Sequence, residues 1–196
     1  LMYLAVTGIY RARWTEQIHD EWIRNLLKNR PDLDPKKLQR TRELMNTNVP
    51  GAVVSGYEPL IDSLFLPDTG DRHVVAAAIQ TRAEAIITFN LKDFPVDYLA
   101  QYNLQAIHPD EFIADQYDLH ASAVTEAARN HRAGLKNPPF DPDQFLDLLL
   151  NQGLPQTVVS APHPPRRDPS GRVSGTAGDE RKRALQGTAC SGNPDE

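Results

Sequence analysis

The sequence contains one cysteine, Cys190, so no disulfide bond can form within it. Aromatic side chains make up only 7% of the residues, and no apolar run approaches the roughly 20 residues that a membrane-spanning helix needs. The start of the sequence shows no signal-peptide pattern. These features argue against a disulfide-stapled scaffold and against a membrane protein, and they lead us to expect a soluble, cytoplasmic protein.

Acidic residues outnumber basic ones, with 26 Asp and Glu against 21 Lys and Arg and a formal net charge of −5. This balance argues against non-specific coating of duplex DNA, but it leaves room for local contacts with phosphates. Nine of the 21 basic residues lie between Arg11 and Arg42. That stretch is either a basic edge of the protein or an ordinary solvated helical surface.

Helices and short strands alternate along the predicted body. Apolar residues at helical spacing predict a helix that opens at Trp14 and ends before Pro31. Asp34 followed by Pro35 predicts the start of a second helix. Further helices are expected from Asp71 and over 112–117, 121–131 and 143–151, and short strands over 52–54, 85–89 and 105–107. This order favours an α/β fold with a parallel sheet.

Four side chains are candidates for a site at one edge of that sheet. Ligands of open parallel sheets bind beyond the carboxyl ends of the strands. Asp71 starts a predicted helix, Asn90 directly follows a predicted strand, and Asp93 lies three residues further on. Glu21 borders the apolar face of its helix, whereas Asp20 should face solvent. Oxygen ligands without a cysteine or a histidine pair suit Mg²⁺ or Mn²⁺ better than zinc.

Each of these acids also has a purely structural interpretation. Asp71 could be an ordinary N-cap, and Asp93 could form a turn before the Phe-Pro pair that follows it. Glu21 could pair with Arg24 or Lys28 on its own helix. The residues by themselves leave both interpretations open.

The remaining polar and aromatic residues give weaker signals. We find no Gly-rich phosphate loop, no recognisable Ser/His/Asp arrangement and no zinc-ligand spacing. His19 and His73 adjoin the candidate acids, and for both we expect a position on a helix surface or a supporting role, not metal ligation. Trp14 and Trp22 are expected in the hydrophobic core.

Several segments resemble the PIN-domain family, the metal-dependent ribonucleases that include VapC-type toxins of bacterial toxin–antitoxin pairs. Residues 71–78 (DRHVVAAA) and 87–95 (ITFNLKDFP) are similar to the second half of a PIN domain. Residues 19–26 (HDEWIRNL) resemble the acid-bearing helix of the family. Residues 132–139 and 152–157 resemble the C-terminal extension of one bacterial subgroup.

The resemblance implies a three-layer α/β/α fold with a small parallel sheet. It assigns residues 1–117 to the PIN-like domain and residues 118–158 to a C-terminal helical extension. Residues 159–196 are expected to be a disordered tail, because their large apolar residues are too few to offset the entropy of ordering the backbone. The first strand of the family, which carries an aspartate of the metal site, would precede Leu1, so we expect this strand to be absent from the sequence.

The resemblance also implies a function and a set of residues for it. The complete protein would be a Mg²⁺-dependent (or Mn²⁺-dependent) endoribonuclease that hydrolyses phosphodiester bonds. Glu21, Asp71 and Asp93 match acidic family positions and would be its catalytic and metal-binding residues, and Thr88 and Asn90 would support them with hydrogen bonds.

The implied partners are RNA and a small antitoxin protein, and a homodimer is compatible with the family. Two other functions stay open at this stage. One is a PIN-like module that has lost catalysis and only binds protein. The other is an α/β phosphatase with an acidic metal site, which would need a nucleophilic aspartate after a first strand.

Overall fold

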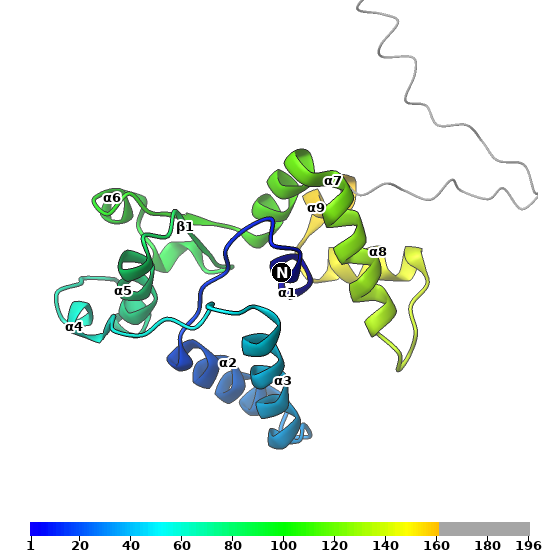
Figure 1. Cartoon of the computed structure of the whole chain (residues 1–196), viewed down its shortest axis with the longest axis horizontal. Helices are drawn as coiled ribbons and strands as arrows, with labels where there is room; N and C mark the ends of the chain where they lie inside the picture. The colour runs from blue at the N-terminus through cyan, green and yellow to red at the C-terminus, as the bar shows by residue number, and fades with distance from the viewer. Residues whose placement is uncertain (161–196) are drawn as a thin grey trace, which may run out of the picture. The chain divides into compact units, whose positions relative to one another are not determined.

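Two parallel strands, β1 (Ala85–Ile87) and β2 (Gln105–Ile107), form the sheet of the computed structural model, which describes residues 1–160 (Figure 1). Ile86 at the centre of β1 pairs with Ala106 of β2. The crossover that a parallel pair requires contains the short helices η2 (Leu91–Asp93) and α6 (Val96–Ala100). The predicted α/β class with a small parallel sheet is therefore confirmed.

Helices make up most of the rest of the described chain. They are α1 (Met2–Thr7), α2 (Glu16–Asn29), α3 (Pro35–Asn48), α4 (Glu58–Ile61), η1 (Thr69–Asp71), α5 (Arg72–Thr81), α7 (Pro109–Gly134), α8 (Pro142–Asn151) and α9 (Pro155–Ser160). Within residues 1–160, none of these helices combines the length and the apolar character that a membrane crossing demands. The expected tail lies almost wholly outside the described residues.

The predicted starts of the first two long helices are correct, and side-chain caps mark both. Thr15 accepts a hydrogen bond from Ile18 N at 3.0 Å and caps α2. Asp34 accepts one from Lys36 N at 2.9 Å and caps α3, with Pro35 in the first turn. These caps satisfy backbone N–H groups that have no partner inside their helix.

Four predicted segments differ from the structure in length or type. The expected strand over 52–54 is only an isolated bridge between Trp14 and Val53. The strand expected over 85–89 ends at Ile87, because the Thr88 hydroxyl accepts a hydrogen bond from Asn90 N and begins a turn. The helices expected over 112–117 and 121–131 are parts of α7, which has non-helical backbone angles at His120.

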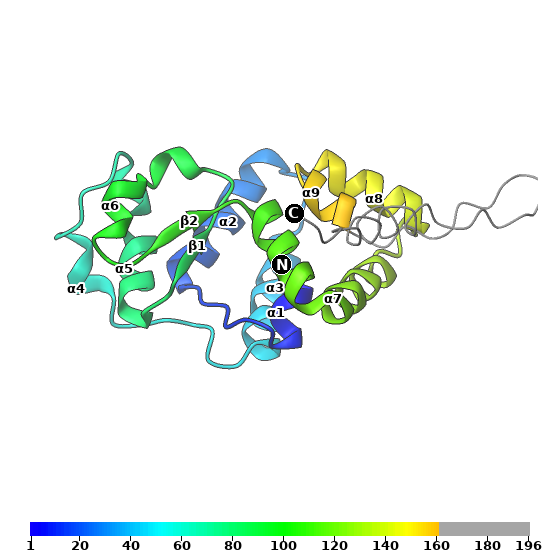
Figure 2. The same ribbon diagram turned by 90° about the horizontal axis from the view of Figure 1, so that it is seen from above.

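The main hydrophobic core lies where α5 packs beside β1 (Figure 2). Val75 and Ala76 of α5 are fully buried, and Ile86 of β1 belongs to the same cluster. Three successive alanines on α5, at 76, 77 and 78, let its backbone come close to the strand. Leu99 of α6 is also fully buried and closes the core on the crossover. This packing fixes the position of the start of α5 relative to the end of β1.

A buried polar network joins α2 to α3. The Asn46 side-chain oxygen accepts a hydrogen bond from Trp14 Nε1 at 2.8 Å and lies 2.9 Å from His19 Nε2. Trp22 Nε1 donates to His19 Nδ1 at 2.9 Å, so the proton of the neutral ring is on Nε2 and points at Asn46. His19 is completely buried. The expectation of a helix-surface position for His19 is therefore wrong, while Trp14 is in the core as predicted.

Asp110 links the start of α7 to the start of α9. Its carboxylate is buried and accepts hydrogen bonds from Gln156 N at 2.9 Å, Thr157 N at 2.8 Å and the Thr157 hydroxyl at 2.8 Å. Burial opposes ionisation, but the hydrogen bonds from Thr157 and Gln156 outweigh it and lower the pKa of Asp110. The carboxylate thus satisfies N–H donors in the first turn of α9, and the first of these donors, Gln156 N, lies 46 residues further along the chain.

We predict that Asp110→Ala lowers the free energy of unfolding by about 2–3 kcal/mol, because it leaves several donors without their charged acceptor. Thermal unfolding should show a fall of roughly 4–12 °C in Tm. The pKa of Asp110 is lower in the folded than in the unfolded state, so its contribution is complete above the unfolded pKa and disappears as the pH falls through the folded pKa. The difference in free energy of unfolding between the variant and the unmodified protein should therefore become smaller at acidic pH.

Asp115→Ala is the matched control, because Asp115 is exposed on the same helix. Equal losses of stability for the two variants would contradict the role assigned to Asp110.

Candidate metal site

A pocket of about 220 Å³ lies at the carboxyl end of β1. Its walls come from α2, from the start of α5 and from the end of β1 with the turn that follows. The lining residues are Ile18, Glu21, Asp71, Val74, Ile86, Ile87, Thr88, Asn90 and Phe94. Four of the five predicted site residues are in this set, and they come from three separate segments of the sequence.

The fifth predicted residue, Asp93, belongs to an adjoining group of carboxylates. Oxygen atoms of Asp68, Asp71 and Asp93 all lie within 4.8 Å of one another. The structure therefore brings Asp71 and Asp93 together as predicted. Glu21 lines the pocket but is not one of this close group of three. We refer to Asp68, Asp71 and Asp93 as the carboxylate triad.

The sequence pattern did not indicate Asp68 as a site residue. It lies in the Pro-Asp-Thr-Gly loop before α5, and its side chain accepts a hydrogen bond from Gly70 N at 2.7 Å. That contact caps η1 and directs the carboxylate towards Asp71 three residues later. The only signal in the sequence was an acid one helical turn before Asp71, in a loop that looked like an ordinary turn.

Asp71 is not a helix-capping side chain. It occupies the N-cap position of α5, but its backbone is helical, with φ −84° and ψ −5°, and its carboxylate makes no capping hydrogen bond. Burial raises its pKa, and so do the negative charges of Asp68, Asp93 and Glu21, while His73 acts in the opposite direction. The capping interpretation is therefore wrong. Asp71 is the acid that the charges of Asp68, Asp93 and Glu21 all repel.

Glu21 contacts α5 and not its own helix. Its Oε1 lies 3.1 Å from Nε2 of His73, whose side chain is 1% exposed. The angle does not suit a hydrogen bond, and both ring nitrogens of His73 lack such a partner among the described residues. The predicted alternative pairing of Glu21 with Arg24 or Lys28 does not occur. A buried imidazole instead places this carboxylate at the pocket wall.

Thr88 and Asn90 organise the turn that carries Asp93. Thr88 N donates to Ile107 O at 3.0 Å, which keeps this residue against β2. The Thr88 hydroxyl accepts a hydrogen bond from Asn90 N at 3.1 Å, and Asn90 Nδ2 donates to Asp93 Oδ2. Asn90 thus contacts one carboxylate of the triad directly, whereas Thr88 acts on it only through Asn90.

The donor set fits a hard divalent cation. The carboxylate triad supplies oxygen atoms, which Mg²⁺ and Mn²⁺ prefer, and it contains no sulfur or imidazole ligand of the kind that zinc sites use. A positive ion would also relieve the mutual repulsion that raises the pKa of Asp71. Asp20, in contrast, is 63% exposed and pairs with Arg42 at 2.8 Å, as its solvent-facing position predicted.

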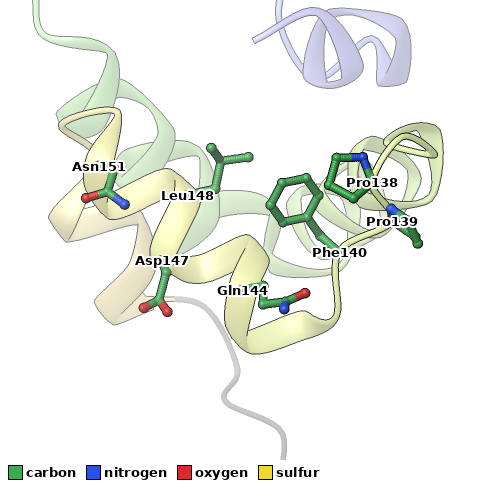
Figure 3. Close-up of a pocket in the computed structure, with 7 residues that line it drawn as sticks. All are labelled: Pro138, Pro139, Phe140, Gln144, Asp147, Leu148 and Asn151. Atoms are coloured by element: carbon green, nitrogen blue, oxygen red, sulfur yellow. The ribbon is translucent and has the colours of Figure 1, made fainter.

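A larger pocket of about 320 Å³ lies against α8 and the loop before it (Figure 3). Pro138, Pro139, Phe140 and Leu148 supply its apolar wall. Asp147 is the one titratable side chain in its lining. A single carboxylate gives this pocket no basis for acid–base or metal chemistry, so the smaller acidic pocket is the candidate site.

Comparison with known proteins gives two matches. The family model described as VapC50 C-terminal domain matches residues 109–160. The protein named "Putative ribonuclease VapC50" from Mycobacterium tuberculosis (strain ATCC 25618 / H37Rv) is 44% identical over 110 residues, which are 56% of this chain and 64% of that relative. The chain thus spans less than two thirds of the relative's length. No solved structure gives a significant match.

We predict that Asp71→Asn stabilises the protein at pH 7 when divalent ions are absent. The variant removes the charge that three neighbouring carboxylates repel and keeps the shape of the side chain. The expected gain is about 0.5–1 kcal/mol, or roughly 1–4 °C in Tm measured in EDTA. Asp97→Asn, an exposed position on α6, should leave Tm unchanged. A lower Tm for Asp71→Asn would contradict the repulsion that we assign to the pocket.

Proposed function

We propose that the chain is a VapC-type PIN-domain protein, as its two matches support, and that its acidic pocket hydrolyses RNA phosphodiester bonds with a bound divalent metal ion. The observation that carries this proposal is the carboxylate triad, which lies beside Glu21 at the carboxyl end of β1. The relative that bears the name ribonuclease supports RNA as the substrate class.

The polar residues of the site have three different roles in this proposal. Asp68, Asp71 and Asp93 would hold Mg²⁺ or Mn²⁺. The ion would supply positive charge against the phosphate oxygens and activate a water molecule. Asn90 fixes the orientation of Asp93 through its hydrogen bond to Oδ2. Glu21 contacts His73 through Oε1, which leaves Oε2 to accept a proton from the attacking water.

The biological role that we propose is that of a toxin in a toxin–antitoxin pair. A small antitoxin protein would then be the inhibitory partner, and the cytoplasm, where RNA is accessible, would be the place of action. A homodimer stays a prediction. The family resemblance and the name of the relative support this role.

Cleavage of single-stranded RNA should depend on the triad and on metal. With the protein expressed from its whole reading frame, Asp71→Asn should lower the cleavage rate by about 100-fold or more, because it removes a charged ligand next to the reacting phosphate. Excess EDTA should abolish cleavage, and Mg²⁺ or Mn²⁺ should restore it. The rates come from gel analysis of a labelled oligonucleotide.

Asp97→Asn serves again as the control, with cleavage like that of the unmodified protein. Activity that persists in EDTA would contradict metal-dependent hydrolysis. If the unmodified protein and Asp97→Asn are both folded and neither cleaves RNA, this result would support the alternative of a PIN-like module that only binds protein.

Metal binding can be measured without any substrate. An ion that binds only the folded state raises Tm, by an amount equivalent to about 2.7 kcal/mol at 100 times its Kd. We predict that millimolar Mn²⁺ raises the Tm of the unmodified protein and of Asp97→Asn but has little effect on Asp71→Asn. A similar rise in all three proteins would place the ion outside the triad.

A further inference from the structure

The two most exposed phenylalanines of residues 1–160 lie beside the acidic pocket. Phe65 is 71% exposed and Phe89 is 63% exposed. Phe89 stands between Thr88 and Asn90, which both line the pocket, and Phe65 precedes Asp68 of the triad by three residues. Exposed aromatic rings leave a large apolar area in water, so their placement next to one polar site indicates a ligand with flat apolar groups.

Phe89 is held in a defined orientation despite its exposure. Its ring packs at right angles against His108, with 5.0 Å between the ring centroids and 88° between the planes. His108 is in turn fixed, because its Nδ1 accepts a hydrogen bond from Asp110 N at 3.2 Å at the start of α7. The ring is therefore ready to receive a ligand without further loss of side-chain freedom.

Phe65 is anchored through its backbone and pairs with a cation. Its N–H donates to the Tyr98 hydroxyl at 2.8 Å, which fixes the main chain at this point. The guanidinium carbon of Arg72 lies 5.9 Å from the centre of its ring, within the range of a cation–π contact. Arg72 directly follows Asp71 and forms no ion pair with any residue of the described range. A positive charge and an aromatic face thus stand together next to Asp71 of the triad.

This combination matches single-stranded RNA better than it matches an apolar protein segment. Unpaired bases stack on aromatic rings and on guanidinium planes, while the phosphates between them seek positive charge. Lys92, next to Asp93, is exposed and has no ion-pair partner in residues 1–160. An RNA chain that has one phosphate at the triad must place the neighbouring nucleotides close to the residues that flank the triad.

We propose that Phe89 and the Phe65–Arg72 pair are stacking surfaces for unpaired RNA bases next to the phosphate at the acidic pocket. The choice of RNA rests on the proposed function. Because stacking accepts any base, these surfaces select single-stranded over paired RNA and give little preference for sequence.

The test measures binding separately from cleavage. Fluorescence anisotropy in Mg²⁺ compares a labelled oligouridine of about 10 nucleotides with an abasic ribose-phosphate oligomer of the same length. The full chain carries Asp71→Asn to prevent cleavage, alone or with Phe89→Leu or Phe65→Leu. Leucine keeps an apolar side chain but has no aromatic face, so each variant should weaken binding of oligouridine by about 5- to 100-fold and leave binding of the abasic oligomer unchanged.

Val96→Ala is the matched control, because Val96 is 79% exposed on α6 and is not aromatic, so it should change neither affinity. The inference is overturned if the two leucine variants affect both oligomers equally or affect neither. It is also overturned if the chain with Asp71→Asn alone binds oligouridine no more tightly than the abasic oligomer. A surface that docks a protein would give this result.

The result is separable from the proposed hydrolysis. Cleavage by the chain with Asp71 intact, together with leucine variants that bind like their parent, would leave the hydrolysis standing and refute the stacking surfaces. Loss of base-dependent binding in the leucine variants, together with no cleavage in Mg²⁺ or Mn²⁺, would support the stacking surfaces and refute the hydrolysis.

Discussion

Electrostatic repulsion among carboxylates is the constraint on which the rest of this structure depends. Asp68, Asp71 and Asp93 place oxygen atoms within 4.8 Å of one another, and Glu21 adds a fourth negative charge to the same region. A chain free to move would separate these charges. They stay together because the buried core between α5 and β1 fixes the two segments that carry Asp71 and Asp93. The free energy of packing thus maintains an electrostatically unfavourable arrangement, which the proposed cation would relieve.

The contacts around the pocket show how this position is maintained. The buried ring of His73 meets Glu21 and connects α5 to α2. Thr88 and Asn90 shape the turn after β1 and orient Asp93. Further away, Asp110 joins α7 to α9, and the network around His19 joins α2 to α3. Asp110 and His19 can be buried without a large cost in stability because both side chains have hydrogen-bonding partners.

Local signals in the sequence predicted much of this architecture. The apolar spacing after Trp14 and the capping residue Asp34 identified two helix starts, because both signals act within a few residues of the chain. The rule that ligands gather beyond the carboxyl ends of parallel strands correctly grouped Asp71, Asn90 and the pocket. Features that depend on tertiary contacts could not be predicted in this way. The contact of Glu21 with His73 on another helix is an example.

Asp68 shows why the candidate site was incomplete. A turn former and a metal ligand look alike in a Pro-Asp-Thr-Gly loop, since only the path of the chain after the turn decides where the carboxylate points. His19 shows a different error, because an imidazole expected on a helix surface or in a supporting role proved to be buried among Trp14, Trp22 and Asn46. In both cases the deciding partners are distant in sequence or are positioned by the fold of a loop.

The most direct test of the account is a calorimetric titration of the protein with Mn²⁺, carried out also on Asp68→Asn and Asp93→Asn. If the carboxylate triad holds the ion, the unmodified protein should show saturable binding, and each variant should weaken it by about 10-fold or more, since each removes one charged ligand. Exposed Asp97→Asn should bind as the unmodified protein does. Equal affinity in all four proteins would contradict the central claim that Asp68, Asp71 and Asp93 form a metal site.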